Sequence, residues 1–136
     1  MKRTLLLGYQ WLTALSDAGT GIMLLLAPEF TLRMMGVQAP ADAIVYISYI
    51  GAFVFSVGLA CLYGVRLLTR RCEPVRLETV WLITAIARAM VAAYVASSVA
   101  TLRLEPGWIG VALFDGACAV VQVVGVRKGW LRASCQ

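Results

Sequence analysis

The sequence contains no histidine, and only seven of its 136 residues are acidic. Without histidine, the chain lacks the residue that most often ligates haem iron and other transition metals. Its cysteines also form no C-x-x-C pair, so their spacing favours neither a zinc site nor a disulfide framework. The four cysteines are Cys61, Cys72, Cys118 and Cys135. We interpret them as small apolar side chains, and we expect no metal and no cofactor.

Charge is scarce, and hydrophobic residues fill the space that it leaves. Only 14% of the residues are charged and 61% are hydrophobic, against roughly 45–50% apolar residues in soluble domains. Residues 4–27, 43–65, 79–102 and 108–126 form four apolar stretches, and each reaches the roughly 20 residues that a helix needs to cross a bilayer. The sequence therefore predicts an all-α integral membrane protein. Residues 1–136 would form a single transmembrane domain, an antiparallel bundle of four membrane-spanning helices.

The net charge of +5 is unevenly distributed. Nine of the twelve basic residues lie before the first stretch, around the second connection or after the fourth stretch: Lys2, Arg3, Arg66, Arg70, Arg71, Arg76, Arg127, Lys128 and Arg132. Because Lys and Arg accumulate on the cytoplasmic side of membranes, this pattern predicts a multi-pass protein of the inner (cytoplasmic) membrane with both termini inside. Membrane lipids with anionic headgroups, and not nucleic acid, are then the expected partners of the basic residues. The start of the chain resembles a signal peptide, but the apolar run resumes at residues 22–27, so we expect no cleavage.

Three ionisable residues lie inside the apolar stretches: Asp17 in the first, Arg88 in the third and Asp115 in the fourth. Each costs roughly 2.5–3.5 kcal/mol on insertion, so such groups usually face the protein interior and pair with one another. At about 1.5 Å per residue, they lie about 20, 14 and 17 Å from the cytoplasmic ends of their helices. The sequence thus predicts an Asp–Arg–Asp cluster near the middle of the membrane, with Arg88 and Asp115 the better matched in depth.

Further polar residues follow these three at helical spacing and so share their faces. The residues that we expect to line a ligand pocket or to join helices by hydrogen bonds are Gln10, Thr13, Trp81, Thr84 and Gln122. Tyr46 and Tyr49, near the outer end of the second stretch, are either residues of the interfacial aromatic belt or hydroxyl donors to a ligand.

Residues 28–36 are predicted to form a short helix in the outer membrane interface. Pro28 is suited to the first position of a helix and Gly36 to the position just past its end. Glu29 and Arg33 are four residues apart, so they either pair with each other or belong to a lid over the polar face of the first stretch.

Residues 25–36 read Leu-Leu-Ala-Pro-Glu-Phe-Thr-Leu-Arg-Met-Met-Gly. Together with a second span that carries Tyr and Gly, an arginine in the third span and an aspartate in the fourth, this run resembles the DoxX-like family of small four-helix membrane proteins. The resemblance implies a four-helix antiparallel bundle in a bacterial-type membrane and association with a redox-linked or quinone-linked partner. The absence of histidine and of paired cysteines departs from a redox role.

Two functions follow from the predicted cluster. Two aspartates around one arginine carry a surplus negative charge, which favours one protonated and one ionised carboxyl group, the pair that a cofactor-independent hydrolase or isomerase uses. Asp17, Arg88 and Asp115 would then be catalytic in a pocket for a small lipophilic molecule, by chemical analogy with epoxide hydrolases of the limonene type. We hypothesise that Asp115 pairs with Arg88 while Asp17 is the working acid on the outer side of that pair. The alternative is a non-catalytic accessory or structural subunit, bound to another membrane protein or to copies of itself, in which the ion cluster fixes helix register.

Overall fold

The computed structural model describes residues 3–71 and 73–134, and all of its regular elements are helical. In chain order they are α1 (Arg3–Leu26), α2 (Pro28–Met34), the 3-10 turn η1 (Ala41–Ala43), α3 (Ile44–Arg66), the π-helical turn η2 (Leu67–Arg71), α4 (Pro74–Ala100), the 3-10 turn η3 (Pro106–Trp108), α5 (Ile109–Arg127) and α6 (Trp130–Ala133). The predicted all-α class is confirmed. Helix α4 begins at Pro74, which is suited to the first turn of a helix, five residues before the apolar stretch that starts at residue 79.

Within the described residues, three helical stretches are long and apolar enough to cross a membrane: Ala41–Arg70, Pro74–Ala100 and Pro106–Arg127. These helices have the length and composition of the helices of a membrane protein. Helix α1 has 24 residues, which is also sufficient length, but it lies outside this group. Its buried side includes the polar residues Gln10, Thr13 and Asp17, and these lower its hydropathy.

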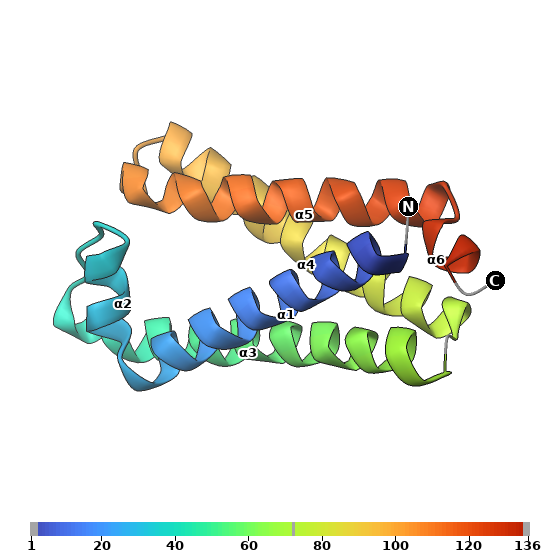
Figure 1. Cartoon of the computed structure of the whole chain (residues 1–136). Helices are drawn as coiled ribbons and strands as arrows, with labels where there is room; N and C mark the ends of the chain where they lie inside the picture. Colours follow the sequence, from blue (N-terminus) through green and yellow to red (C-terminus); the bar gives the residue numbers. More distant parts are fainter. Residues whose placement is uncertain (1–2, 72, 135–136) are drawn as a thin grey trace.

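The long helices form two closely packed pairs, α1 with α3 and α4 with α5 (Figure 1). Glycine permits the first pairing. A Cβ atom added to Gly58 of α3 would lie 2.4 Å from the backbone nitrogen of Ala18, and one added to Gly21 of α1 would lie 2.4 Å from that of Phe55. Such close backbone approach is how apolar helices associate where the hydrophobic effect supplies no drive.

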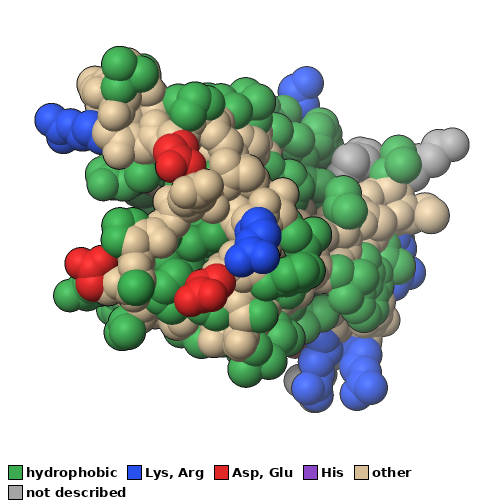
Figure 2. All heavy atoms as spheres, turned by 90° about the vertical axis from the view of Figure 1, so that its left-hand side faces the viewer, with side chains coloured by type: hydrophobic (Ala, Val, Ile, Leu, Met, Phe, Trp, Pro, Cys, Tyr) green, Lys and Arg blue, Asp and Glu red, His purple; other side chains and the backbone are tan. Residues whose placement is uncertain are grey.

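Helix α2 occupies the predicted short-helix region and covers one end of the α1–α3 pair (Figure 1). Leu32 and Val37 pack there against Leu24 and Ile47 in an apolar cluster. The segment after α2 also meets the turn before α5, since the backbone N–H of Gln38 donates to Glu105 Oε2 at 3.2 Å. Figure 2 looks onto this end and shows acidic and basic side chains scattered among hydrophobic and uncharged surface.

A second apolar cluster closes the opposite end of the molecule. Its buried members are Leu6, Leu67, Leu68, Leu77, Trp81 and Leu131. Helix α6 folds back onto α4 at this end, because Gly129 adopts a left-handed conformation (φ 64°) that glycine tolerates. Arg132 of α6 then donates from Nε and Nη2 to the two carboxylate oxygens of Glu78, at 2.8 and 3.0 Å. This hydrogen bonding by Glu78 raises the pKa of Arg132 above its ordinary value, so Arg132 remains a cation.

Candidate functional site

Arg88 lies at the centre of a buried ion cluster that joins three helices. Its Nη1 donates to Asp115 Oδ1 of α5 at 2.7 Å, and its Nη2 donates to Asp17 Oδ2 of α1. The residue is only 3% exposed. A planar guanidinium carries its donors in a fixed fork, so one arginine on α4 can hold carboxylates from two helices on different sides. The structure thus contains the Asp–Arg–Asp cluster that the sequence predicts.

The arrangement within the cluster differs from the hypothesis drawn from helix depth. That hypothesis paired Arg88 with Asp115 and placed Asp17 on the outer side of that pair; the structure contains the Arg88–Asp115 pair and also joins Arg88 to Asp17. The difference arises because depth along a helix axis ignores the length of the arginine side chain, which spans the offset between levels. If both carboxyl groups are ionised, the cluster carries one surplus negative charge.

The edge of the cluster lies at Asp115. The Asp115 side chain is 17% exposed, and the Asp17 side chain 9%. The Arg88 guanidinium lies 5.6 Å from the ring centroid of Phe114, within the range of a cation–π contact. Arg88 Nε is buried without a hydrogen-bond partner among the described residues. Asp115 is therefore the more exposed of the two carboxylates that Arg88 binds.

Gln10 connects three helices beside the ion cluster. Trp81 Nε1 of α4 donates to Gln10 Oε1 at 2.8 Å, and Gln10 Nε2 donates to the backbone oxygen of Cys61 on α3 at 2.9 Å. All of these groups are buried. A Cβ atom added to Gly64 would lie 2.4 Å from Gln10 Nε2, so the amide occupies the space that this glycine leaves. Gln10 and Trp81 therefore act here as interhelical hydrogen-bonding residues.

Thr84 and Gln122 join α4 to α5 through buried polar side chains. Gln122 Nε2 donates to Thr84 Oγ1 at 2.9 Å, and Thr84 Oγ1 donates to the Val80 backbone oxygen at 2.8 Å. Gln122 Oε1 is buried without a partner among the described residues. The Thr13 hydroxyl donates within its own helix, to the backbone oxygens of Tyr9 and Gln10.

We expect Trp81→Phe to lower the free energy of unfolding by about 1–2 kcal/mol, because Gln10 Oε1 would stay buried without its donor. Reversible unfolding in mixed detergent micelles would measure the loss. Trp11→Phe is the matched control, since Trp11 is exposed; its change should stay within about 0.5 kcal/mol. Equal losses in both variants would contradict a structural role for the indole N–H.

Four of the predicted site residues lie outside this group of buried polar side chains. Tyr46 and Tyr49 are 71% and 64% exposed, and the ring of Tyr49 contacts Phe53 edge-on. Glu29 and Arg33 of α2 are also exposed. Their ligand-binding and lid roles stay predictions.

Two residues that contact these buried side chains were not predicted from the sequence. The hydroxyl of Tyr9 donates to the Cys118 backbone oxygen at 3.2 Å, and its ring lies 5.3 Å from that of Trp81. Tyr9 stands four residues before Thr13 and eight before Asp17, so helical spacing alone could have found it. Phe114 carries no such signal, because it directly precedes Asp115.

Cysteine chemistry and metal binding gain no support from the described residues. No group of three or more His, Cys, Asp or Glu side chains lies close enough there to hold a metal ion. Cys61 and Cys118 are free and buried, in keeping with their interpretation as small apolar residues; Cys72 and Cys135 lie outside the described residues.

No family model matches this sequence, and neither a curated protein nor a solved structure matches it.

Proposed function

We propose that this chain is a non-catalytic accessory or structural subunit of a membrane assembly, in which the Asp17–Arg88–Asp115 cluster fixes the register of the helices. Its fold would be an antiparallel bundle of four membrane-spanning helices, α1, α3, α4 and α5, in the inner membrane with both termini cytoplasmic. The resemblance to DoxX-like proteins is consistent with this arrangement. A second membrane polypeptide or another copy of this chain is the expected partner.

The exposed side of α1 supports its inclusion as a spanning helix. It includes the large apolar residues Leu5, Leu12, Leu15, Ile22 and Leu26, while Gln10, Thr13 and Asp17 are buried. A helix with this division can face lipid with its apolar side. The proposed orientation rests on the basic residues, since Arg3, Arg66, Arg127 and Arg132 would all lie on the cytoplasmic side.

One observation carries the structural role: Arg88 is hydrogen-bonded to α1 and to α5 at once. These helices belong to different packed pairs, and each pair makes most of its backbone contacts within itself. The cluster therefore ties the pairs together at one level. In helices made otherwise of similar apolar side chains, such a buried polar contact distinguishes one register from the others.

The test replaces the whole cluster by apolar residues, in the triple variant Asp17→Leu/Arg88→Met/Asp115→Leu. If the cluster is architecture, the variant should stay folded with stability equal to or above that of the wild type, since replacing all members of a buried ion cluster leaves no unpaired charge. Native mass spectrometry from mild detergent should show the same bound small molecules in both proteins. A small lipophile held by the wild type and lost in the folded triple variant would overturn the structural role.

A pocket for a small lipophilic molecule is the second candidate, and the partial exposure of the Asp115 side chain favours it. There the Asp115 carboxylate, accessible beside Phe114, would accept a hydrogen bond or proton from the ligand, while Arg88 and Asp17 hold its position. Acid/base catalysis of the epoxide hydrolase or isomerase type would use the same groups. Asp115→Asn, which preserves size, should then abolish ligand binding in a folded protein; unchanged binding would exclude this candidate.

A further inference from the structure

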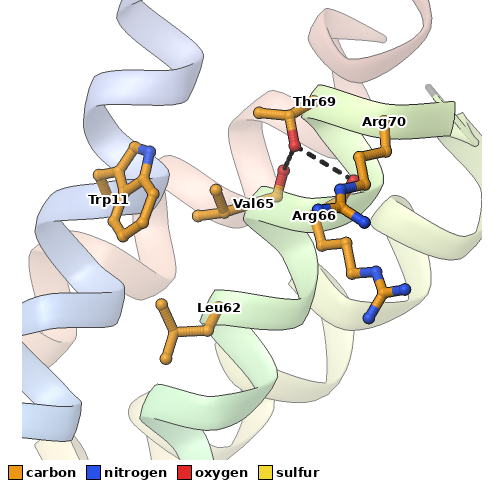
Figure 3. A pocket seen from close by; sticks show the side chains of 6 residues that line it. All are labelled: Trp11, Leu62, Val65, Arg66, Thr69 and Arg70. Carbon is orange, nitrogen blue, oxygen red and sulfur yellow. Dashed lines mark hydrogen bonds between the residues drawn. The ribbon is translucent and has the colours of Figure 1, made fainter.

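Two neighbouring hollows flank the π-helical turn η2 at the end of α3. The first has a volume of about 270 Å³ and is lined by Trp11, Leu62, Val65, Arg66, Thr69 and Arg70 (Figure 3). The second has a volume of about 310 Å³ and is lined by Arg3, Thr4, Leu7, Leu68 and Thr69. Thr69 borders both. Neither hollow is lined by a residue of the Asp–Arg–Asp cluster, and π-helical turns are frequent at functional sites.

The positive side of the first hollow consists of Arg66 and Arg70. They are four residues apart, and Figure 3 shows both extending from the same stretch of helix beside Thr69. Among residues 3–71 and 73–134, neither guanidinium has an ion-pair partner, whereas the nearby Arg76 pairs with Glu73 at 2.8 Å. Like charges at this spacing repel each other. An anion bound between them would remove that repulsion.

The apolar side of the same hollow comes from both helices of a packed pair. Trp11 extends from α1 toward Leu62 and Val65 of α3 (Figure 3). Tryptophan is enriched where the apolar interior of a membrane meets its headgroups. A ligand that satisfies both sides of the hollow has an anionic head and an apolar chain.

We propose that this hollow binds an anionic phospholipid, with the phosphodiester between Arg66 and Arg70 and the first part of an acyl chain against Trp11, Leu62 and Val65. Guanidinium groups bind phosphate oxygens through paired, charge-assisted hydrogen bonds. Arg3 adds positive charge from the second hollow, where its Nη2 already donates to the Leu68 backbone oxygen at 3.1 Å. The site rests on the proposed membrane arrangement, which puts this end of α3 at the membrane surface.

Native mass spectrometry of the full chain in mild detergent tests the site, with phosphatidylglycerol, phosphatidylcholine and inorganic phosphate as separate probes. The wild type should bind phosphatidylglycerol more tightly than phosphatidylcholine, and Arg66→Gln/Arg70→Gln should reduce this preference by roughly tenfold. The matched control Arg127→Gln/Lys128→Gln loses the same charge from exposed residues that line neither hollow and should keep the preference. Trp11→Ala should weaken the binding of both lipids without changing the preference.

Three outcomes would overturn the lipid site. Equal loss of preference in the two double variants would show general attraction to a basic surface. Binding of inorganic phosphate that Trp11→Ala leaves unchanged, without any preference for phosphatidylglycerol, would show a site for free phosphate. A folded wild type with no preference would remove the site but leave the ion-cluster experiment standing, because the apolar triple variant retains Arg66 and Arg70. Should Arg66→Gln/Arg70→Gln misfold, the single variant Arg70→Gln replaces it, and it should also show a reduced preference for phosphatidylglycerol.

Discussion

Arg88→Leu should lower the free energy of unfolding by about 3–5 kcal/mol. Without the Arg88 guanidinium, the carboxylates of Asp17 and Asp115 would both lack a counter-charge. Both side chains are at most 17% exposed. The link between the α1–α3 and α4–α5 pairs would be lost at the same time. Reversible unfolding in mixed detergent micelles measures the change.

The control for this loss is Arg76→Leu. Arg76 also pairs with an acidic residue, Glu73, but its side chain is 63% exposed, and exposed ion pairs contribute at most about 1 kcal/mol. The apolar triple variant of the whole cluster should recover all of the stability that Arg88→Leu loses, since it leaves no carboxylate unpaired. A mild effect of Arg88→Leu, or a triple variant as unstable as the single one, would contradict the cluster's structural role.

Gly58→Leu should cost about 3 kcal/mol or prevent folding, because α1 passes directly over this glycine. An added Cβ would lie 2.4 Å from the Ala18 backbone nitrogen and 2.8 Å from its Cα. Backbone atoms cannot rotate away as a side chain can, so α1 and α3 would have to separate, and overpacking of this kind is strongly destabilising. The same unfolding measurement quantifies the loss.

Gly19→Leu on α1 is the control, because this glycine makes no close contact with another helix. A Cβ at Gly19 meets nothing within 4 Å, and leucine favours helix more than glycine by up to about 1 kcal/mol. We therefore expect this variant to be neutral or slightly stabilised. Similar losses at Gly58 and Gly19 would show that glycine's effect here is one of helix propensity and not of close packing.

Much of the site was accessible from the sequence because membrane burial makes polar residues conspicuous. Asp17, Arg88 and Asp115 were the only Asp, Glu, Lys or Arg residues inside the apolar stretches, and an intramembrane charge must find a partner. Gln10, Thr84 and Gln122 followed from helical spacing on the same faces, and all three are buried in hydrogen-bonded contacts. By contrast, Tyr46 and Tyr49 carried no spacing signal that linked them to the cluster, and both are exposed.

The sequence alone determined the all-helical class, the positions of the long helices to within a few residues, and the membership of the ion cluster. These depend on composition, length and period, which are local properties of the chain. Tertiary structure decided that Arg88 binds both aspartates, that Gln10 accepts from Trp81, and that hollows form around Leu67–Arg71. Such features depend on side-chain reach and on the packing of helices against one another. Neither is encoded in the spacing of residues along any one helix.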